Sequence, residues 1–167
     1  MPSGWRKGGP DAHRRNAETQ PLGLTYRGST LARDERDAPT CAQAGDRAPD
    51  APCHDALETP VRLFDIFRGP HFTLLAFGPH HAATVAAVSQ RYGAAVRAYA
   101  VARPGEPTSN ATLVDTEGHA NRAYDIDAGT LVLVRPDGYV GLITQHPSAG
   151  CVYDYLKHVA PPDKMTR

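Results

Sequence analysis

The stretch of sequence that decides the fold is Phe72-Thr73-Leu74-Leu75-Ala76-Phe77, which Gly78-Pro79 follows directly. A short apolar run between chain breakers is typical of a β-strand that is buried on both faces. Residues 80–92 come next and carry apolar side chains at three- and four-residue spacings, as in an amphipathic helix. Residues 95–101 then alternate as a second strand. This order predicts a parallel strand pair joined by a right-handed crossover helix.

A β-hairpin is the clearest local signal in the second half of the chain. Apolar runs at 131–134 and 139–143 flank Arg135-Pro136-Asp137-Gly138. Proline presets φ at the second position of a turn, and glycine accepts the positive φ that closing the hairpin needs. A short polar helix is expected before the hairpin, over 120–124. An apolar stripe predicts a last helix over 147–159.

The order of these elements indicates the fold. A β–α–β unit followed by a helix, a β-hairpin and a C-terminal helix is the element order of the thioredoxin fold. We therefore predict an α/β domain with a thioredoxin-like fold, in which flanking helices cover a central mixed sheet. Upstream of the first buried strand, residues 61–63 are expected to form a short strand and 64–68 one helical turn, which Gly69-Pro70 ends.

The domain boundaries follow from changes in pattern. Residues 1–40 nearly lack periodic apolar pattern, so we expect a linker or tail that is partly disordered. Within it, residues 22–27 alternate and predict a short strand-like segment that lies on a neighbour. The thioredoxin-like domain is expected over 41–160, and 161–167 form a C-terminal tail. Residues 44–52 must be extended or turned, because each residue before a proline is pushed away from the helical region.

Charge and composition exclude several classes of function. The 18 basic residues balance 18 acidic ones, which gives no electrostatic case for a nucleic-acid or membrane partner. No apolar run approaches the roughly 20 residues of a bilayer span, and residues 1–10 lack the apolar region of a secretory signal. The three cysteines (Cys41, Cys53 and Cys151) show no paired spacing, which favours reduced thiols in a cytoplasmic protein. A Cys41–Cys53 bridge stays open.

The turn where a thioredoxin-like protein does its chemistry contains no cysteine. Active members place a thiol at the helix N-terminus after the first buried strand. The upstream segments also look like the lead-in of peroxiredoxins, whose turn reads Pro-x-x-x-Thr-x-x-Cys; counted from Pro79, those positions hold Ala83 and Ala86. The proline that normally precedes the facing strand is missing from residues 127–131. Disulfide exchange and peroxide reduction both need the thiolate, so we assign no catalytic residue.

Histidines and acidic residues near this turn do not form a convincing site. His71, His80 and His81 invite a metal interpretation, but no acidic or thiol ligand lies close in the sequence, so capping or solvent-facing roles are expected. Four acidic residues around a helix start are expected to act as caps and first-turn charges: Asp115, Glu117, Asp125 and Asp127. We assign neither metal-binding nor cofactor-binding residues.

Residues 22–159 resemble the C-terminal domain of the FAD-dependent aromatic-ring hydroxylases, the class A flavoprotein monooxygenases. The segments that carry the resemblance keep their order and spacing: Leu24-Thr25-Tyr26-Arg27-Gly28-Ser29, Ala44-Gly45-Asp46-Arg47-Ala48-Pro49-Asp50, Arg62-Leu63-Phe64-Asp65, Phe72-Thr73-Leu74-Leu75 and Leu133-Val134-Arg135-Pro136-Asp137-Gly138-Tyr139-Val140. The resemblance implies a thioredoxin-like module that has lost its redox cysteines. In that family the module follows a large region that binds FAD and substrate.

The FAD machinery of that family is not recognisable in this sequence. It begins with a strand, a G-x-G-x-x-G turn and a helix that cradle the pyrophosphate, whereas Gly8-Gly9-Pro10 has the wrong spacing and no preceding strand. Gly45-Asp46 is superficially similar to the family's second FAD motif, but it runs into Arg47-Ala48-Pro49 and an extended segment. We therefore expect no cofactor in this chain, with FAD belonging to the region that precedes the module.

Three hypotheses for function follow. The first is a non-catalytic packing or association domain that docks on a flavoprotein monooxygenase or forms a homo-oligomer; FAD- and NAD(P)H-dependent monooxygenation would then be the family's activity and not that of this chain alone. The second is a stand-alone thioredoxin-like protein that binds a small ligand near residues 77–81. The third is a thiol redox enzyme that uses Cys41, Cys53 or Cys151, which requires a thiol of lowered pKa.

Overall fold

The computed structural model describes residues 24–37, 39, 41–126, 129–146 and 148–160. The strands in these residues are β1 (Arg33–Asp34), β2 (Pro52–His54), β3 (Pro60–Arg62), β4 (Phe72–Phe77), β5 (Val96–Ala102), β6 (Thr112–Val114), β7 (Leu131–Val134) and β8 (Val140–Thr144). The helices are α1 (Leu63–Phe67), α2 (Ala82–Tyr92), α3 (His119–Tyr124) and α4 (Ala149–Val159), with 3-10 turns η2 (Pro79–His81) and η3 (Gly93–Ala95).

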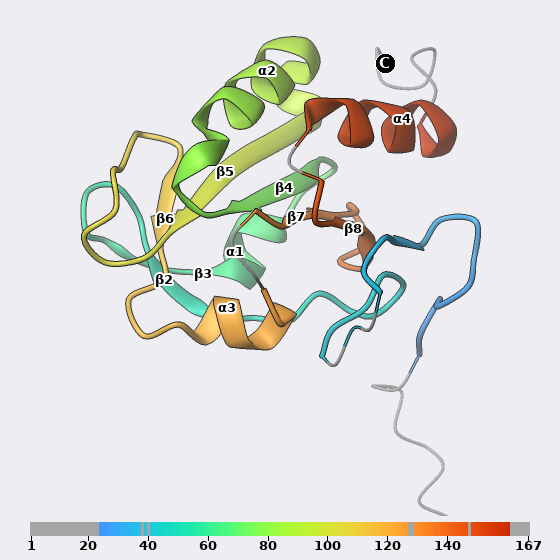
Figure 1. Ribbon diagram of the computed structural model, residues 1–167, viewed down its shortest axis with the longest axis horizontal. Helices are drawn as coiled ribbons and strands as arrows, with labels where there is room; N and C mark the ends of the chain where they lie inside the picture. Colours follow the sequence, from blue (N-terminus) through green and yellow to red (C-terminus); the bar gives the residue numbers. More distant parts are fainter. Residues whose placement is uncertain (1–23, 38, 40, 127–128, 147, 161–167) are drawn as a thin grey trace, which may run out of the picture.

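The strands form one mixed sheet in the order β1-β8-β7-β4-β5-β6-β2-β3. Figure 1 shows α2 and α4 on one side of this sheet and α1 and α3 on the other. β4 lies inside the sheet, parallel to β5 and antiparallel to β7. The predicted α/β architecture, with helices flanking a mixed central sheet, is confirmed.

Alternate residues of β4 point to opposite faces of the sheet, and both faces are covered. Leu74 and Ala76 pack in the apolar cluster that also contains residues of α2 and α4. Leu75 and Phe77 pack in the second cluster, with residues of α1 and α3. All four side chains are 0–1% exposed. The prediction of a strand buried on both faces is therefore confirmed, and the continuous apolar run has this physical reason.

The predicted β–α–β unit is formed by β4, α2 and β5. The two strands pair in parallel over their whole common length, from the Phe72–Val96 pair to the Phe77–Val101 pair. The α-helix begins at Ala82, two residues later than predicted, because residues 79–81 form the tighter η2 turn that starts with proline. It ends at Gly93, which adopts the positive φ of +53° that glycine accepts.

The predicted hairpin is formed by β7 and β8, which pair antiparallel. Its turn is closed by hydrogen bonds from the Arg135 N–H to the Tyr139 carbonyl (2.8 Å) and from the Gly138 N–H to the Arg135 carbonyl (2.9 Å). Gly138 has φ +81°, which is why a glycine is needed there. Asp137 accepts a hydrogen bond from the Tyr139 N–H and pairs with Arg135, as expected of a turn residue.

The two remaining helices agree closely with the sequence. α3 covers the predicted 120–124 with one residue more, and α4 begins at Ala149 and ends at Val159. The hydroxyl of Ser148 accepts a hydrogen bond from the Gly150 N–H at the start of α4, a side-chain N-cap. Among the described residues, none of the helices combines the length and apolar character needed to cross a bilayer.

The segment before residue 41 differs from the prediction. Residues 24–27 form no strand, and Leu24 is 64% exposed, so its alternation does not mark a buried face; residues 22 and 23 lie outside the described residues. A strand forms instead at β1, which pairs in parallel with β8. The sheet thus begins inside the segment expected to be a tail. Residues 1–23, 38 and 40 of that predicted tail and the predicted tail at 161–167 lie outside the described residues.

Gly45 brings this segment onto the domain. The Tyr26 N–H donates to the Gly45 carbonyl (2.7 Å), and the Gly45 N–H donates to the Val140 carbonyl of β8 (2.7 Å). A Cβ at Gly45 would lie 2.5 Å from the carbonyl carbon of Tyr26 and 2.7 Å from the Cα of Arg27. The close approach of two backbones therefore requires glycine at this position.

We expect Gly45→Ala to lower the free energy of unfolding by about 3 kcal/mol, because it combines a positive φ with overpacking against backbone. Gly28→Ala is the matched control: its φ is also positive (+74°), but a Cβ there has no atom within 4 Å. The control should lose only about 1 kcal/mol. Urea unfolding at neutral pH measures both. Equal losses would show that the backbone contact at Gly45 adds nothing.

Candidate functional site

The turn after β4 lies where the predicted fold carries its redox cysteine, and it contains no cysteine. Gly78 has φ +109°, and Pro79 opens η2, which leads into α2. Ala83 and Ala86, which stand where a peroxiredoxin-like turn would have threonine and cysteine, are both exposed on α2. No nucleophilic side chain stands at either position, so this turn cannot carry out thiol chemistry.

A buried histidine occupies the base of the turn. His81 is 2% exposed, its ring is hydrogen-bonded with the backbone of Phe77, and its Nδ1 has no partner among the described residues. Burial lowers the pKa of His81 below 6.5, the nearby His80 lowers it further, and the hydrogen bond with Phe77 offsets only part of this. The imidazole is therefore held neutral inside the fold.

The three histidines do not assemble a metal site. The Nε2 atom of His71 lies 3.2 Å from the carbonyl oxygen of Ile66 in α1, in a buried position. His80 is exposed. In the part of the chain that the structure describes, no group of three or more histidine, cysteine, aspartate or glutamate side chains is placed to hold a metal ion.

The cavity at the turn is small. It measures about 40 Å³ and is lined by residues that include Phe77, Pro79, Arg103 and Asn121. A water molecule takes about 30 Å³ in the liquid, whereas small-molecule sites measure roughly 300–1,000 Å³. This size counts against the second hypothesis, a ligand bound near residues 77–81.

The cysteines do not offer a reactive thiol at the fold's usual position. Cys53 is 2% exposed on β2, and burial, with smaller contributions from Asp115 and Asp50, raises its pKa to about 12. Cys53 is a free thiol, so no disulfide joins it to Cys41. Cys41 is exposed and Cys151 is half-buried in α4. A protonated, buried Cys53 counts against the third hypothesis.

Asp115 binds the first turn of α3 from outside the helix; the N-cap residue itself is Gly118, and the first turn contains no acidic residue. The Oδ2 atom of Asp115 accepts hydrogen bonds from the backbone N–H (2.9 Å) and the side-chain amide (2.8 Å) of Asn121, in the first turn of α3. Asp125 lies at the other end of α3 with φ +52°. Asp127 lies outside the described residues. Glu117 lies before the helix and contacts His119 Nε2 (2.7 Å). Of the described residues in this group, only Asp115 bonds the start of α3, so the prediction of caps and first-turn charges holds for Asp115 alone.

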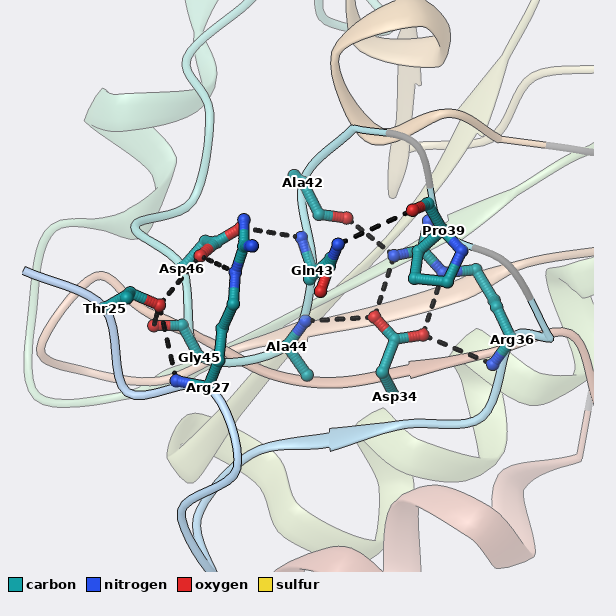
Figure 2. Close-up of polar contacts among 10 residues, drawn as sticks. All are labelled: Thr25, Arg27, Asp34, Arg36, Pro39, Ala42, Gln43, Ala44, Gly45 and Asp46. Carbon is teal, nitrogen blue, oxygen red and sulfur yellow. Dashed lines mark hydrogen bonds and ion pairs between the residues drawn. The ribbon is translucent and has the colours of Figure 1, made fainter. Parts of the chain in front are cut away.

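The densest polar network lies at the segment before the domain, here called the N-terminal arm (residues 24–37). Figure 2 shows two aspartates that tie it to residues 42–46. Asp46 accepts hydrogen bonds from Nε and Nη2 of Arg27 (both 2.6 Å), the Thr25 hydroxyl (2.9 Å) and the Gln43 N–H (2.9 Å). Both carboxylate oxygens of Asp46 are thus occupied by this chain's own donors.

Asp34 and Arg36 form the second tie. Asp34 accepts from Nε (2.9 Å) and Nη2 (2.8 Å) of Arg36 and from the Ala44 N–H (3.1 Å). The Arg36 side chain is 4% exposed and also donates to the carbonyls of Ala42 (2.6 Å) and Tyr124 (3.0 Å). Because its donors bind Asp34, the Ala42 carbonyl and the Tyr124 carbonyl, this buried charge links the arm, the 42–46 loop and α3.

Residues Gly45-Asp46 therefore do not fit a flavin-contacting motif. The backbone of Gly45 is covered by Tyr26 and Arg27, and the carboxylate of Asp46 is saturated by the arm. A ribityl hydroxyl would have to displace the charge-assisted bonds from Arg27, which are the stronger ones.

Hydrogen bonding also sets the ionisation of the two aspartates. Burial by itself would raise the pKa of Asp46, but bonds from Arg27, Gln43 and Thr25 outweigh it and hold the pKa below 3.8. The pKa of Asp34 is lowered in the same way, with burial opposed by bonds from Arg36 and Ala44. Both carboxylates are charged at neutral pH, and in that form they hold the arm to residues 42–46.

Comparison with known proteins identifies the domain. The protein family described as "Aromatic-ring hydroxylase, C-terminal" matches residues 42–160, most of the chain. The chain belongs to this family. The resemblance inferred from the sequence is thereby confirmed for the aromatic-ring hydroxylase C-terminal domain.

Relatives of this domain are long flavoproteins. A flavin-dependent monooxygenase of Mycobacteroides abscessus is 38% identical over 157 residues, which cover 89% of this chain and 26% of that protein. Aklavinone-11 hydroxylase, crystallised with FAD and aklavinone, superposes with a TM-score of 0.61 at 31% identity, over 83% of this chain and 26% of that one. The chain thus spans about a quarter of the length of these relatives.

Solved structures of thiol-disulfide oxidoreductases share this fold. The thioredoxin domain of such an enzyme from Bacteroides vulgatus superposes with a TM-score of 0.54 at 14% identity, over 66% of this chain and 96% of that one. A putative thiol:disulfide interchange protein from Chlorobium tepidum superposes with a TM-score of 0.56 at 18% identity, over 71% and 96%. At these identities the likeness shows the fold alone, and it confirms the thioredoxin-like prediction.

The sequence did not predict the hydrogen bonds and ion pairs of the arm, because their partners are far apart along the chain. The charge run at residues 33–37 was available as a signal, but a run of mixed charge is usually a solvated surface. Only the fold shows that Asp34 and Arg36 turn inward while Arg33 pairs with Glu35 beside them. The alternation at residues 22–27 predicted contact with a neighbour, and the described residues Thr25–Arg27 do make that contact, although not as a strand.

The neutral His81 predicts a pH dependence between pH 7 and pH 5. Because its folded pKa lies below 6.5, the unfolded chain binds a proton first, so the free energy of unfolding falls as pH drops below 6.5. His81→Leu should flatten this part of the curve, and Gln90→Ala, an exposed neutral position on α2, serves as control. Urea unfolding across this range measures the slope. An unchanged slope in His81→Leu would contradict the buried, neutral histidine.

The arm predicts a second pH dependence at lower pH. The depressed pKa values of Asp34 and Asp46 contribute stability that is present above about 3.8 and lost as pH falls through their folded values. Asp46→Asn should cost about 1 kcal/mol at pH 7, and this difference from wild type should shrink as pH approaches 2.

The measurement is urea unfolding of wild type, Asp46→Asn and a control from pH 7 down to pH 2. Asp154→Asn is the control, because Asp154 is an exposed carboxylate on α4 without an ion pair among the described residues. A difference between Asp46→Asn and wild type that persists unchanged in acid would mean that Asp46 does not hold the arm as a charged group.

Proposed function

We propose that this aromatic-ring hydroxylase C-terminal domain is a non-catalytic packing and association module of a flavin-dependent aromatic-ring monooxygenase. The observation that carries the proposal is the turn after β4. It lies where the fold would carry a redox cysteine, but the predicted thiol position holds the exposed Ala86, and His81 in the same turn is buried. A domain that keeps the scaffold and lacks the reactive group supports a structural role.

The arm supports the same proposal. Two aspartate–arginine pairs, a short strand on β8 and the contact at Gly45 hold residues 24–37 in a fixed path on the domain. A segment held in this way at the surface of the domain supports a role in association. The proposed partner is a flavoprotein region of the kind that makes up the rest of the relatives, in the same or another chain; a second copy of this domain is the alternative.

The proposed location is the cytoplasm, where reduced thiols are expected.

No cofactor is proposed for this chain. FAD and the aromatic substrate would be bound by the flavoprotein region, and the activity of the whole assembly would be monooxygenation with FAD and NAD(P)H. Within the described residues, the Gly45-Asp46 pair is already committed to the arm. The domain's own contribution would be to stabilise and orient the partner.

The first experiment is an absorbance titration of the purified 167-residue chain with FAD, with the Mycobacteroides abscessus monooxygenase as positive control. We expect no flavin bands in the purified chain, no change in the FAD spectrum on mixing, and no flavin-dependent oxidation of NAD(P)H. Copurified flavin or saturable binding would overturn the proposal, because it would place a cofactor site within this domain.

A mixing experiment tests association directly. The chain is combined with the same monooxygenase from which its own matching C-terminal quarter has been removed, and the mixture is separated by size exclusion. We expect co-elution with the flavoprotein, or a dimer of the chain alone. A chain that elutes as a monomer in both cases would argue against the association role.

A further inference from the structure

A groove separate from the redox turn lies between α1 and the hairpin turn. It measures about 410 Å³, and its walls come from three distant segments: Arg47, the end of α1 with Phe64, Phe67 and Arg68, and the turn residues 136–138. The walls are fixed by backbone contacts, since Arg47 forms a β-bridge with Tyr139 and the Ala48 N–H donates to the Gly138 carbonyl (2.9 Å). The volume falls in the range of small-molecule sites.

The apolar part of the groove consists of two phenylalanine rings, one exposed and one buried. Phe64 is 40% exposed, although large apolar side chains are usually covered. Phe67 beside it is 6% exposed, and the two ring centroids are 6.4 Å apart. A flat apolar group placed on Phe64 would bury this ring and gain the contact energy that aromatic faces offer.

The charge of the groove is positive. The Arg47 side chain is exposed, and its Cζ lies 5.8 Å from the Phe64 ring centroid; no carboxylate pairs with it among the described residues. Arg68 is 82% exposed and has only Asp65 at 3.5 Å, itself 58% exposed. The one carboxylate in the lining, Asp137, is paired with Arg135. Two guanidinium groups therefore remain available to an anion.

The other cavities described do not have this combination. A groove of about 500 Å³ near β2 has no arginine and no phenylalanine in its lining. Its Asp55 accepts from the N–H groups of Leu57 and Thr59, and its His54 lies 3.0 Å from the Thr116 hydroxyl. The cavity at the redox turn has room for about one water. Among the cavities formed by the described residues, the groove at Phe64 combines an exposed ring with Arg47, which has no ion pair there, and with Arg68, whose single ion pair is solvent-exposed.

We propose that this groove binds a small monoanion with a flat apolar body, of the aryl carboxylate class. The carboxylate would be held by Arg47 and Arg68 through charge-assisted hydrogen bonds, and the flat body would lie on Phe64. The groove is built by this chain alone and involves no flavin, so this inference does not depend on the proposed function.

The test uses 2-naphthoate as probe and the neutral 2-naphthamide, which has the same shape, as its control. Isothermal titration calorimetry of the full chain should show saturable binding of the carboxylate, and binding of the amide should be about tenfold weaker because it lacks the charge. Arg47→Gln and Arg68→Gln should each weaken naphthoate binding by about the same factor. Arg97→Gln, an exposed arginine on β5 outside the groove, should leave binding unchanged.

A spectroscopic readout locates the site independently of affinity. On titration with naphthoate, the backbone amide signals of Gly69 and Gly138, which line the groove, should shift in wild type and not in Phe64→Ala. Urea unfolding of each variant checks that it remains folded. The proposal is overturned if no saturable binding occurs at millimolar probe, if the amide binds equally well, if Arg97→Gln matches the groove variants, or if the shifted signals cluster on another face.

Discussion

The structure depends on one strand that has no solvent-facing side. β4 pairs with β5 on one edge and β7 on the other, and its alternate side chains fill the two apolar clusters above and below the sheet. A strand in that position is predominantly apolar, and Thr73 is its one polar residue. Such a strand requires helices on both faces, which are supplied by α2 and α4 on one side and by α1 and α3 on the other (Figure 1). The crossover helix places β5 on one edge of β4, and the hairpin places β7 on the other.

The same constraint explains why the turn after β4 needs no cysteine to be held in place. The turn is positioned by the end of β4 and the start of α2, whose packing needs Phe77, Val85 and Val88 in the core and no cysteine. His81 is buried at this place with one nitrogen unpartnered. The domain shares its fold with a thiol-disulfide oxidoreductase, and the turn after β4 carries no cysteine.

Polar interactions in this domain concentrate at the N-terminal arm instead. Asp46 and Asp34 each gather several donors, and the buried Arg36 is satisfied by one carboxylate and two carbonyls. Such a network costs much if one member is removed, since the remaining charge is left buried. It fixes the path of the arm beside β8. This path matters most for a domain whose relatives are longer flavoproteins.

The sequence by itself determined the features that rest on local pattern. The buried strand at 72–77, the helix after it, the hairpin around Arg135-Pro136-Asp137-Gly138 and the last helix all depend on periodicity or turn chemistry within a few residues. The absence of a thiol at Ala83 and Ala86 could likewise be read directly, because it is a statement about residue identity. The resemblance to the hydroxylase family rested on segments that keep their order and spacing.

Only the tertiary structure decided the arm, the outer strands and the groove. Arg36 reaches a carbonyl 88 positions away at Tyr124, and the Tyr155 hydroxyl donates to the carbonyl of Leu31, 124 positions away. No local pattern encodes such contacts, so the charge run at 33–37 looked like solvated surface and the alternation at 22–27 looked like a strand. Arg47, Phe64 and Pro136 likewise meet in one groove because the sheet brings three distant segments together, and that placement follows from long-range packing, which no single segment of the sequence specifies.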